Sequence, residues 1–297
     1  MDSMLAPKIV VIILTYRQPA KTLECLSYLT AEPDVPFQIL VWDNGSQDET
    51  AAVVRAAYPS VTVHYHPENL GVAGGRNAAA KMAMEEMSAK HLLFLDNDIW
   101  VEPGFVGALY APFNENAGVG QTQAKLRFMN DPEKINDGGG ARINFVLWQV
   151  TPVGYGELDL GQYDTPRSCI ACGGAMMVRA DVFQELNGFD PLFGPFGPED
   201  LDFSLRLQKS GYQAVFIPKA VGYHEISHTY GKGYSEDYAR HKSRHWLAFM
   251  KRHASLRQKI AFYALGAPYL AVNVIFREVR RGNWKAVRGL LKGVLKG

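Results

Sequence analysis

Short apolar runs alternate with helical segments over the first 100 residues, and this alternation constrains the fold more than any other feature of the chain. The run from Lys8 to Leu14 is mostly β-branched, as expected of a strand that is buried on both faces of a sheet. Three further strand-like runs follow, each after a segment with helical spacing: residues 37–42, 61–64 and 91–95. Strands that alternate with helices in this way predict an α/β fold with a mostly parallel central sheet flanked by helices.

Polar residues stand where three of these strands end. Thr15, Asp43 and Asp96 each close one apolar run. Ligands of open parallel sheets bind outside the carboxyl ends of the strands. The sequence therefore predicts a binding site at this edge of the sheet.

The rest of the chain is less regular. We expect antiparallel strands and loops over residues 118–163, with strands near 120–128 and 141–150, because this stretch is rich in Gly, Asn and Asp. A helix is expected from Arg76, after a glycine-rich turn, and another from Leu201 to Ser210. The later expected strands cover residues 174–178 and 214–217, with a short helix at 181–186 between them. We expect residues 1–240 to form the main domain and residues 241–297 a basic helical extension.

The C-terminal region differs in charge from the rest of the chain. From Arg240 onward lie 14 of the 31 Lys and Arg residues but only one of the 30 acids. Such a segment seeks an anionic surface. It contains 17 uncharged residues, Ile260 to Phe276, at the lower limit of a membrane span, and helices lying in the headgroup region fit better. The alternative is a helical unit that packs on the main domain or forms a homodimer.

Two features predict a cytoplasmic setting. The residues Met1 to Pro7 lack the basic and apolar segments of a secretory signal, and three cysteines cannot make a disulfide framework. With the basic tail, these features predict a protein that is peripheral on the inner face of the cell membrane.

Eight short motifs occur in the order typical of one enzyme family. They are VIILTYR (11–17), VWDNGS (41–46), NLGVAGGRN (69–77), LDND (95–98), GGAMMVR (173–179), GFD (188–190), GPED (197–200) and VGYH (221–224). In this set the chain resembles the family 2 glycosyltransferases with the GT-A fold. Within them it is most similar to the bacterial rhamnosyltransferase-like branch, which builds cell-surface glycans on lipid-linked acceptors. The resemblance covers residues 8–230 and implies an inverting enzyme.

The acids at 96 and 98 predict a metal site. Two carboxylates one residue apart at a strand end suit a hard cation that also binds a substrate diphosphate, although capping acids in loops are common. The resemblance implies that Asp98 and His224 are metal ligands, with His228 as the alternative, and that the cofactor is Mn²⁺ or Mg²⁺. It implies that Asp96 and Asn97 contact the nucleotide sugar.

The pair Glu199-Asp200 is read by residue type as an ordinary helix start, where the helix dipole lowers the pKa of a carboxylate. The resemblance instead implies a catalytic pair. Inverting transfer needs a base for the acceptor hydroxyl. The family pattern assigns that role to Asp200, with Glu199 holding the acceptor or Asp200.

Residues 69–77 are typical of a phosphate cradle, because glycines let backbone N–H groups approach an anion. They match neither the P-loop nor the dinucleotide-binding pattern. The resemblance implies that the nucleotide sugar contacts Thr15, Tyr16, Arg17, Asp43, Asn44, Gly71, Arg76 and Asn77. A carboxylate such as Asp43 can accept the imide N–H of uracil or thymine, which favours a UDP or dTDP donor.

The sequence thus predicts a metal-dependent hexosyltransferase. It would move rhamnose or another hexose from a UDP- or dTDP-sugar to a lipid-linked or polysaccharide acceptor. One alternative is a nucleotidyltransferase, although the residues after the first strand match its glycine-rich signature poorly. The others are a lectin-like relative without activity and a nucleic-acid-binding protein that uses the basic tail, whereas our reading includes no nucleic acid.

Overall fold

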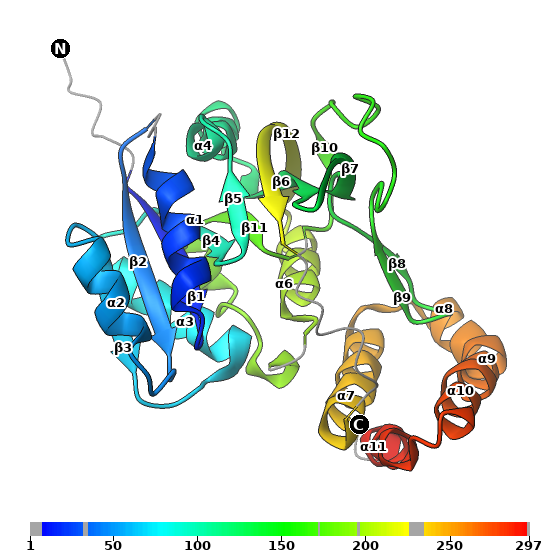
Figure 1. Cartoon of the computed structure of the whole chain (residues 1–297). Coiled ribbons are helices and arrows are strands. Elements are labelled where there is room, and N and C mark those ends of the chain that lie inside the picture. The colour runs from blue at the N-terminus through cyan, green and yellow to red at the C-terminus, as the bar shows by residue number, and fades with distance from the viewer. Residues whose placement is uncertain (1–7, 32–34, 172, 195–196, 226–234, 296–297) are drawn as a thin grey trace.

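The structure, a computed structural model of the 297-residue chain, describes residues 8–31, 35–171, 173–194, 197–225 and 235–295. Its main feature is a mixed sheet with the strand order β10-β12-β6-β11-β4-β1-β2-β3 (Figure 1). Two more strands join it, because β5 pairs with β12 and β7 pairs with β6.

The parallel part of the sheet comes from the first 100 residues, as predicted. Its strands are β1 (Ile9–Thr15), β2 (Phe37–Asn44), β3 (Thr62–His66) and β4 (His91–Asp96). The helices between them are α1 (Pro19–Ala31), α2 (Thr50–Ala57) and α3 (Gly71–Glu86). Val11 and Ile13 pack in one apolar cluster, while Val10 and Ile12 pack in another. The strand is therefore buried on both faces, which explains why its sequence is an unbroken apolar run.

The second half of the sheet carries the catalytic loops. Its strands are β5 (Ile99–Val101), β6 (Val119–Phe128), β7 (Asp131–Asp137), β10 (Arg167–Ser168), β11 (Ala175–Arg179) and β12 (Gln213–His224). Its helices are α4 (Phe105–Glu115), α5 (Ala180–Glu185), the 3₁₀ turn η1 (Pro191–Phe193) and α6 (Glu199–Lys209). β11 runs antiparallel to both β4 and β6, so this half of the sheet is mixed.

Several expected boundaries were wrong. α3 begins at Gly71 and not at Arg76, so the glycines form its first turns. A Cβ at Gly75 would lie 2.7 Å from Leu14 Cδ1, so this helix approaches β1 more closely than a larger residue allows. The single strand expected over residues 141–150 is a hairpin, β8 (Ala141–Asn144) with β9 (Gln149–Pro152).

The strand expected at residues 214–217 is also longer than predicted. β12 continues to His224 through an irregularity between Ile217 and Val221, where its register with β6 shifts. This interruption hid the second half of the strand from a pattern search. The extension places His224 opposite Ile99, directly after the Asp96-Asn97-Asp98 turn.

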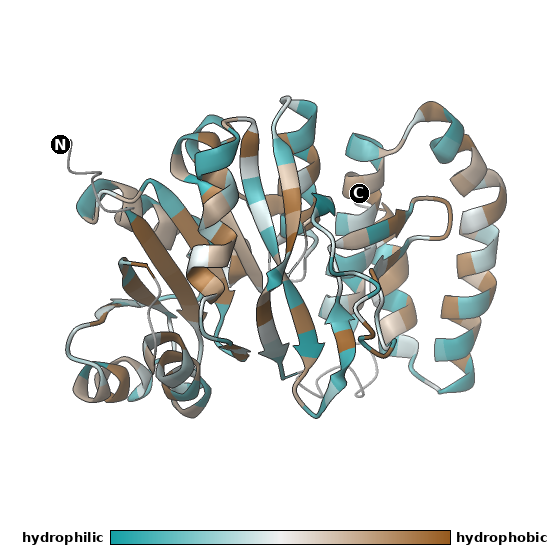
Figure 2. Ribbon diagram, turned by 90° about the horizontal axis from the view of Figure 1, so that it is seen from above, coloured by the Kyte–Doolittle hydropathy of each residue, from teal (hydrophilic) through white to brown (hydrophobic). Residues whose placement is uncertain are grey.

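The C-terminal region is helical, as expected. It consists of α7 (Glu236–His253), one continuous helix at Leu256–Arg280 and α11 (Trp284–Leu295). The continuous helix comprises α8 (Leu256–Ala261), η3 (Phe262–Gly266), α9 (Ala267–Leu270), η4 (Ala271–Ile275) and α10 (Phe276–Arg280), of which η3 and η4 are π-helical. Figures 1 and 2 both show these helices at one end of the molecule, beyond the β8–β9 hairpin.

α7 belongs physically to the main body of the protein. It runs without a break through residues 240 and 241, where the extension was expected to begin. Its last turn is fixed to α6, because Arg252 Nη1 and His253 Nε2 each lie 2.8 Å from an oxygen of the buried Asp202. Arg206, one turn along α6, pairs with the same carboxylate. A charged and fully buried group of this kind needs all its partners, so it couples the two helices firmly.

The helix Leu256–Arg280 is exposed along much of its length. Among the described residues it is the helix that is long and apolar enough to cross a membrane, by length and composition. Only 11% of its most apolar 18-residue stretch is buried.

Candidate functional site

A pocket of about 480 Å³ opens at the carboxyl ends of β1, β2 and β4, beside the first turns of α3 and α6. It gathers residues from five separate parts of the sequence. The predicted site residues that line it are Thr15, Tyr16, Asn44, Gly71, Arg76, Asp96, Asn97, Asp98, Glu199 and Asp200. Sequence reasoning missed Gln18, Asn69 and Gly173, which also line it. Asn69 lies within the glycine-rich motif, and that position was the available signal.

Arg76 connects the acids of the site. Its side chain is buried, with Nη2 at 2.6 Å from Asp96 Oδ1 and Nη1 at 3.4 Å from Glu199 Oε1. The arginine projects from α3, while the acids come from the end of β4 and the start of α6. One buried cation therefore holds together the acidic groups of two distant motifs.

Glu199 and Asp200 differ in environment. Burial, helped by the negative charge of Asp200, raises the pKa of Glu199 to about 7, although Arg76 opposes this shift. For Glu199, the expectation of a lowered pKa at a helix start was wrong, because burial outweighs the dipole. Asp200 accepts hydrogen bonds from the backbone N–H groups of Gly173 and Leu201, which orient its carboxylate.

The structure brings the predicted metal ligands together. His224 Nε2 lies 3.5 Å from Asp98 Oδ1, and its other ring nitrogen lies 3.1 Å from Asn136 Oδ1. Burial lowers the pKa of His224, but the negative charges of Asp98 and Asp96 outweigh it and the net shift is upward. His228 lies outside the described residues.

A carboxylate and an imidazole at this distance fit a divalent ion that completes its shell with phosphate and water. Within the described part of the chain, no group of three or more His, Cys, Asp or Glu side chains is arranged to hold a metal. A cation here would therefore depend on oxygen atoms of a bound diphosphate.

The nucleobase side of the site is formed by Asp43 and its neighbours. Asp43 is fully buried, and its Oδ1 accepts a hydrogen bond from the backbone N–H of Ser46 at 2.9 Å. Its Oδ2 is buried without a hydrogen-bond partner. Arg17 Nε donates to the carbonyl of Ser46 at 3.0 Å, which fixes the loop after β1 to the loop after β2. An unpartnered buried oxygen of this kind is costly unless a ligand supplies a donor.

Asn44 and Asn77 play structural parts in the cradle. The amide of Asn44 donates to Asn69 Oδ1 and to the carbonyl of Gly71, each at 3.1 Å, which holds the start of α3 against β2. Asn77 was expected to face the nucleotide, but the structure does not bring it to the pocket. Its amide is engaged with both backbone groups of Phe189, at 2.7 Å and 2.9 Å, because α3 must be fixed to the GFD loop.

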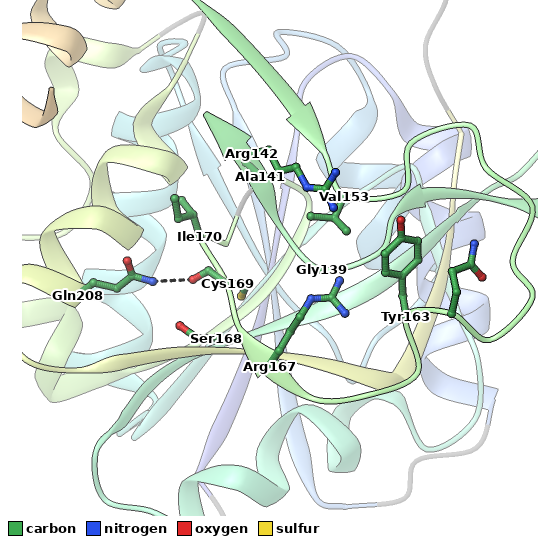
Figure 3. Close-up of a pocket in the computed structure, with 11 residues that line it drawn as sticks. Gly139, Ala141, Arg142, Val153, Tyr163, Arg167, Ser168, Cys169, Ile170 and Gln208 are labelled. Atoms are coloured by element: carbon green, nitrogen blue, oxygen red, sulfur yellow. Dashed lines mark hydrogen bonds between the residues drawn. The ribbon is translucent and has the colours of Figure 1, made fainter. Parts of the chain in front are cut away.

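A second pocket, of about 550 Å³, lies beside β10 and contains none of the predicted site residues (Figure 3). Its arginine, Arg167, donates to the carbonyl of Gly138 and lies over the rings of Phe216 and Tyr163. Gln208 likewise donates to the carbonyl of Cys169 at 2.7 Å. These polar groups are used in packing, so the pocket at the strand ends is the candidate site.

Comparison with known proteins agrees with this arrangement. Residues 10–186 match the model of Glycosyl transferase family 2, and residues 159–282 match that of Glycosyl transferase family group 2. The chain belongs to glycosyl transferase family 2. It is an enzyme of the inverting hexosyltransferase class, and it uses a nucleotide-sugar donor. This membership confirms the predicted enzyme class and decides against the nucleotidyltransferase alternative.

Similar proteins extend over almost the whole chain. The N-acetylglucosaminyl-diphospho-decaprenol L-rhamnosyltransferase of Mycobacterium tuberculosis is 24% identical over 94% of this chain and 97% of its own. The crystal structure of GalNAc-T7 with UDP, GalNAc and Mn²⁺ is similar with a TM-score of 0.63 and 17% identity, over 94% of this chain and 58% of that one. A mannosyltransferase of Pyrobaculum calidifontis, in complex with GDP-Man and Mn²⁺, is similar with a TM-score of 0.59 and 16% identity, over 99% and 88%. These likenesses confirm the predicted GT-A fold.

Proposed function

We propose that this glycosyltransferase moves rhamnose or another hexose from a dTDP- or UDP-sugar to a lipid-linked or polysaccharide acceptor during cell-surface glycan synthesis. The observation that carries the proposal is the pocket at the strand ends, where Arg76 joins Asp96 to Glu199. The mycobacterial relative, which matches along nearly its whole length, bears the name of a rhamnosyltransferase for a diphospho-decaprenol acceptor.

The acids of α6 are proposed as the catalytic pair. The oxygen of the acceptor hydroxyl attacks the anomeric carbon, the bond from that carbon to the nucleoside diphosphate breaks, and the hydroxyl proton passes to Asp200. The backbone N–H groups of Gly173 and Leu201 hold the Asp200 carboxylate in place for this transfer. Glu199 holds the acceptor or Asp200, since its own carboxylate is turned toward Arg76.

Asp98 and His224 are proposed to hold the divalent cation, Mn²⁺ or Mg²⁺. When bound, such an ion offsets the negative charge that builds up on the departing diphosphate. The protein supports this by keeping His224 oriented through Asn136 and by keeping Asp96 paired with Arg76. Asp96 and Asn97 then remain for contacts with the ribose and the phosphates.

Asp43 is proposed to select the nucleobase. Its buried Oδ2 has no partner in the protein, and the imide N–H of uracil or thymine would supply one. Cytosine and adenine lack that donor, so the arrangement favours UDP or dTDP. Tyr16 lines the pocket nearby, and Thr15 and Gly71 border it.

We further propose that residues 1–240 act as the catalytic domain and that residues 241–297 hold the enzyme at the inner face of the cell membrane. The support is the charge of the tail together with its exposed apolar side chains. The apolar residues that are at least half exposed on the helix Leu256–Arg280 are Leu256, Ile260, Tyr263, Leu265, Val272 and Phe276. Packing of these side chains against a second copy in a homodimer is the competing explanation.

A donor screen tests the proposed function. We expect UDP- or dTDP-sugars to be hydrolysed slowly in the presence of Mn²⁺ or Mg²⁺, with GDP- and CMP-sugars inert. Hydrolysis that ignores the nucleobase would contradict the assignment of Asp43. The absence of binding to any UDP or dTDP compound would contradict the proposed donor class.

A further inference from the structure

A second enclosed space lies in the C-terminal region, outside the proposed catalytic site. This cavity, of about 540 Å³, is bounded by α7, the helix Leu256–Arg280, α11 and the turn between β8 and β9. Its volume falls in the range of sites that bind small molecules. Most of the side chains that line it are apolar, among them Trp148, Trp246, Leu247, Leu270 and Val274.

The walls of the cavity are braced at both ends. Phe262 stacks on Trp148 with ring centroids 4.9 Å apart, and Gly266 comes so close to the carbonyl of Val146 that no side chain could fit there. At the other end Glu278 is buried and accepts hydrogen bonds from Arg277 at 3.0 Å and Asn283 at 2.9 Å. Because the helix is fixed on each side, the space between is preformed.

The charges of the lining have one sign. Lys242 and Arg277 both line the cavity, and no acidic side chain is among the described residues that do so. An apolar interior with cationic side chains fits a hydrocarbon chain that carries a phosphate or diphosphate at one end. Sugar donors and other fully polar ligands would lose their hydration there without gaining partners.

The cavity also adjoins the catalytic loop. Trp246 and Leu247 face it from α7, while the preceding residue, His245, places Nδ1 at 3.0 Å from the carbonyl of Gly197. Gly197 lies two residues before Glu199. The cavity and the catalytic acids are therefore separated by about one helix diameter, roughly 10 Å.

We propose that this cavity binds the isoprenoid chain of a diphosphate-linked acceptor and thereby places the acceptor sugar beside Glu199 and Asp200. The inference rests on the proposed transfer to a lipid-linked acceptor. It assigns to the C-terminal helices a substrate site in addition to membrane contact. Lys242 and Arg277 hold the diphosphate, while the apolar side chains enclose the chain.

Binding of farnesyl diphosphate to the full chain tests this, measured by calorimetry with saturating UDP and Mg²⁺ to block the donor pocket. We expect farnesyl diphosphate to bind at least tenfold more tightly than inorganic pyrophosphate. Val274→Phe, which fills the cavity, should weaken farnesyl diphosphate at least tenfold. The matched control Val272→Phe, at an exposed position of the same helix that does not line the cavity, should leave the affinity unchanged.

Equal affinities for farnesyl diphosphate and pyrophosphate, or equal effects of the two Phe variants, would overturn the inference. Dodecyl phosphate binding as tightly as farnesyl diphosphate would overturn the isoprenoid assignment in favour of a general lipid tail. If Val274→Phe lowers the thermal unfolding temperature, Val274→Ser with Val272→Ser as control replaces the pair, and only the former should weaken binding. Loss of self-association in Val274→Phe, with farnesyl diphosphate binding unchanged, would assign the cavity to a second copy of the chain.

UDP binding and donor hydrolysis are measured on the same samples. Failure of the cavity to bind the isoprenoid, with donor hydrolysis intact, overturns this inference alone. Absence of UDP binding in the wild-type protein contradicts the proposed function instead.

Discussion

The guanidinium of Arg76 lies 3.4 Å from the carboxylate of Glu199, and both side chains are buried. The same guanidinium lies 2.6 Å from Asp96. The acid at the donor side and the acid at the acceptor side thus share one cation. A change of charge on either acid will therefore be felt by the other through Arg76.

The raised pKa of Glu199 predicts how stability depends on pH. Between its usual pKa near 4.5 and the folded value of about 7, the folded state holds a proton that the unfolded state has released. The contribution of this group is therefore fully present below pH 4.5 and is lost as the pH rises through 7. We expect the free energy of unfolding of the wild type, relative to Glu199→Gln, to fall by up to about 3 kcal/mol over this range.

Urea unfolding at several pH values measures this difference. Glu115→Gln, an exposed acid at the end of α4, is the matched control and should show no such trend. A difference between wild type and Glu199→Gln that stays constant with pH would mean that the carboxylate is ionised throughout.

Metal dependence is predicted by the pairing of Asp98 with His224. Asp98→Ala should abolish donor hydrolysis, as should chelation by EDTA, because the departing diphosphate then lacks its counter-ion. The thermal unfolding temperature should change little, since Asp98 contributes little to packing. Asp131→Ala, which removes an exposed acid paired with Lys134, serves as control and should stay active. Full activity in EDTA would rule out the metal site.

The proposed base predicts a separation of binding from chemistry. Asp200→Asn keeps the shape of the side chain but removes its basicity, so UDP affinity should be nearly unchanged while transfer falls about 10²-fold or more. Asp237→Asn, at a similar position in the first turn of α7, should transfer normally. Normal transfer by Asp200→Asn would assign the base to another group, with Glu199 next in line.

The parallel half of the fold could be predicted because its information is local. β1 is buried on both faces, and its apolar run shows this directly. The start of α3 was missed because glycine is a poor helix former, and only the close approach of Gly75 to Leu14 explains why it stands there. The second half of β12 was missed because its register shifts after Ile217.

The site was predictable by motif, but its connections were not. The motifs name Arg76, Asp96 and Glu199, yet nothing in their spacing shows that one cation joins them. Asn77 belongs to the same motif and is used instead to fix Phe189. The cavity in the C-terminal region could not be foreseen, since it depends on how three helices pack and not on any one of them.

One contact within that packing did have a sequence signal. Gly289 and Gly293 lie four residues apart on α11, where small residues let helices approach closely. A Cβ at Gly293 would collide with Ser243 Oγ and the carbonyl of Arg240 on α7. Gly293→Leu should therefore lower the free energy of unfolding by about 1–3 kcal/mol. Arg288→Ala, an exposed change on the same helix, should have little effect, and equal effects of the two would mean that α11 does not pack here.

The last prediction concerns the membrane. Each Lys or Arg near an anionic leaflet contributes roughly 1 kcal/mol, so removing four exposed charges should weaken vesicle binding on the order of 10²-fold or more. The variant replaces with Gln four exposed residues of the tail: Arg280, Arg281, Lys285 and Arg288. Its control carries the same change of net charge at four exposed positions of the catalytic domain: Lys8, Lys81, Lys90 and Lys219. Co-sedimentation with phosphatidylserine-containing and neutral vesicles, at low and high salt, measures the result.

We expect the tail variant to lose binding to anionic vesicles, while UDP affinity and donor hydrolysis stay at the wild-type level. The control variant should bind anionic vesicles as the wild type does, because its altered charges are not on the proposed membrane face. Equal losses in both variants would show that net charge and not the tail is responsible. If the wild type ignores both salt and lipid charge but still binds vesicles, the exposed apolar face of the helix Leu256–Arg280 accounts for binding by insertion. If the wild type binds no vesicles at all, that face must be covered by protein, and the homodimer becomes the better explanation.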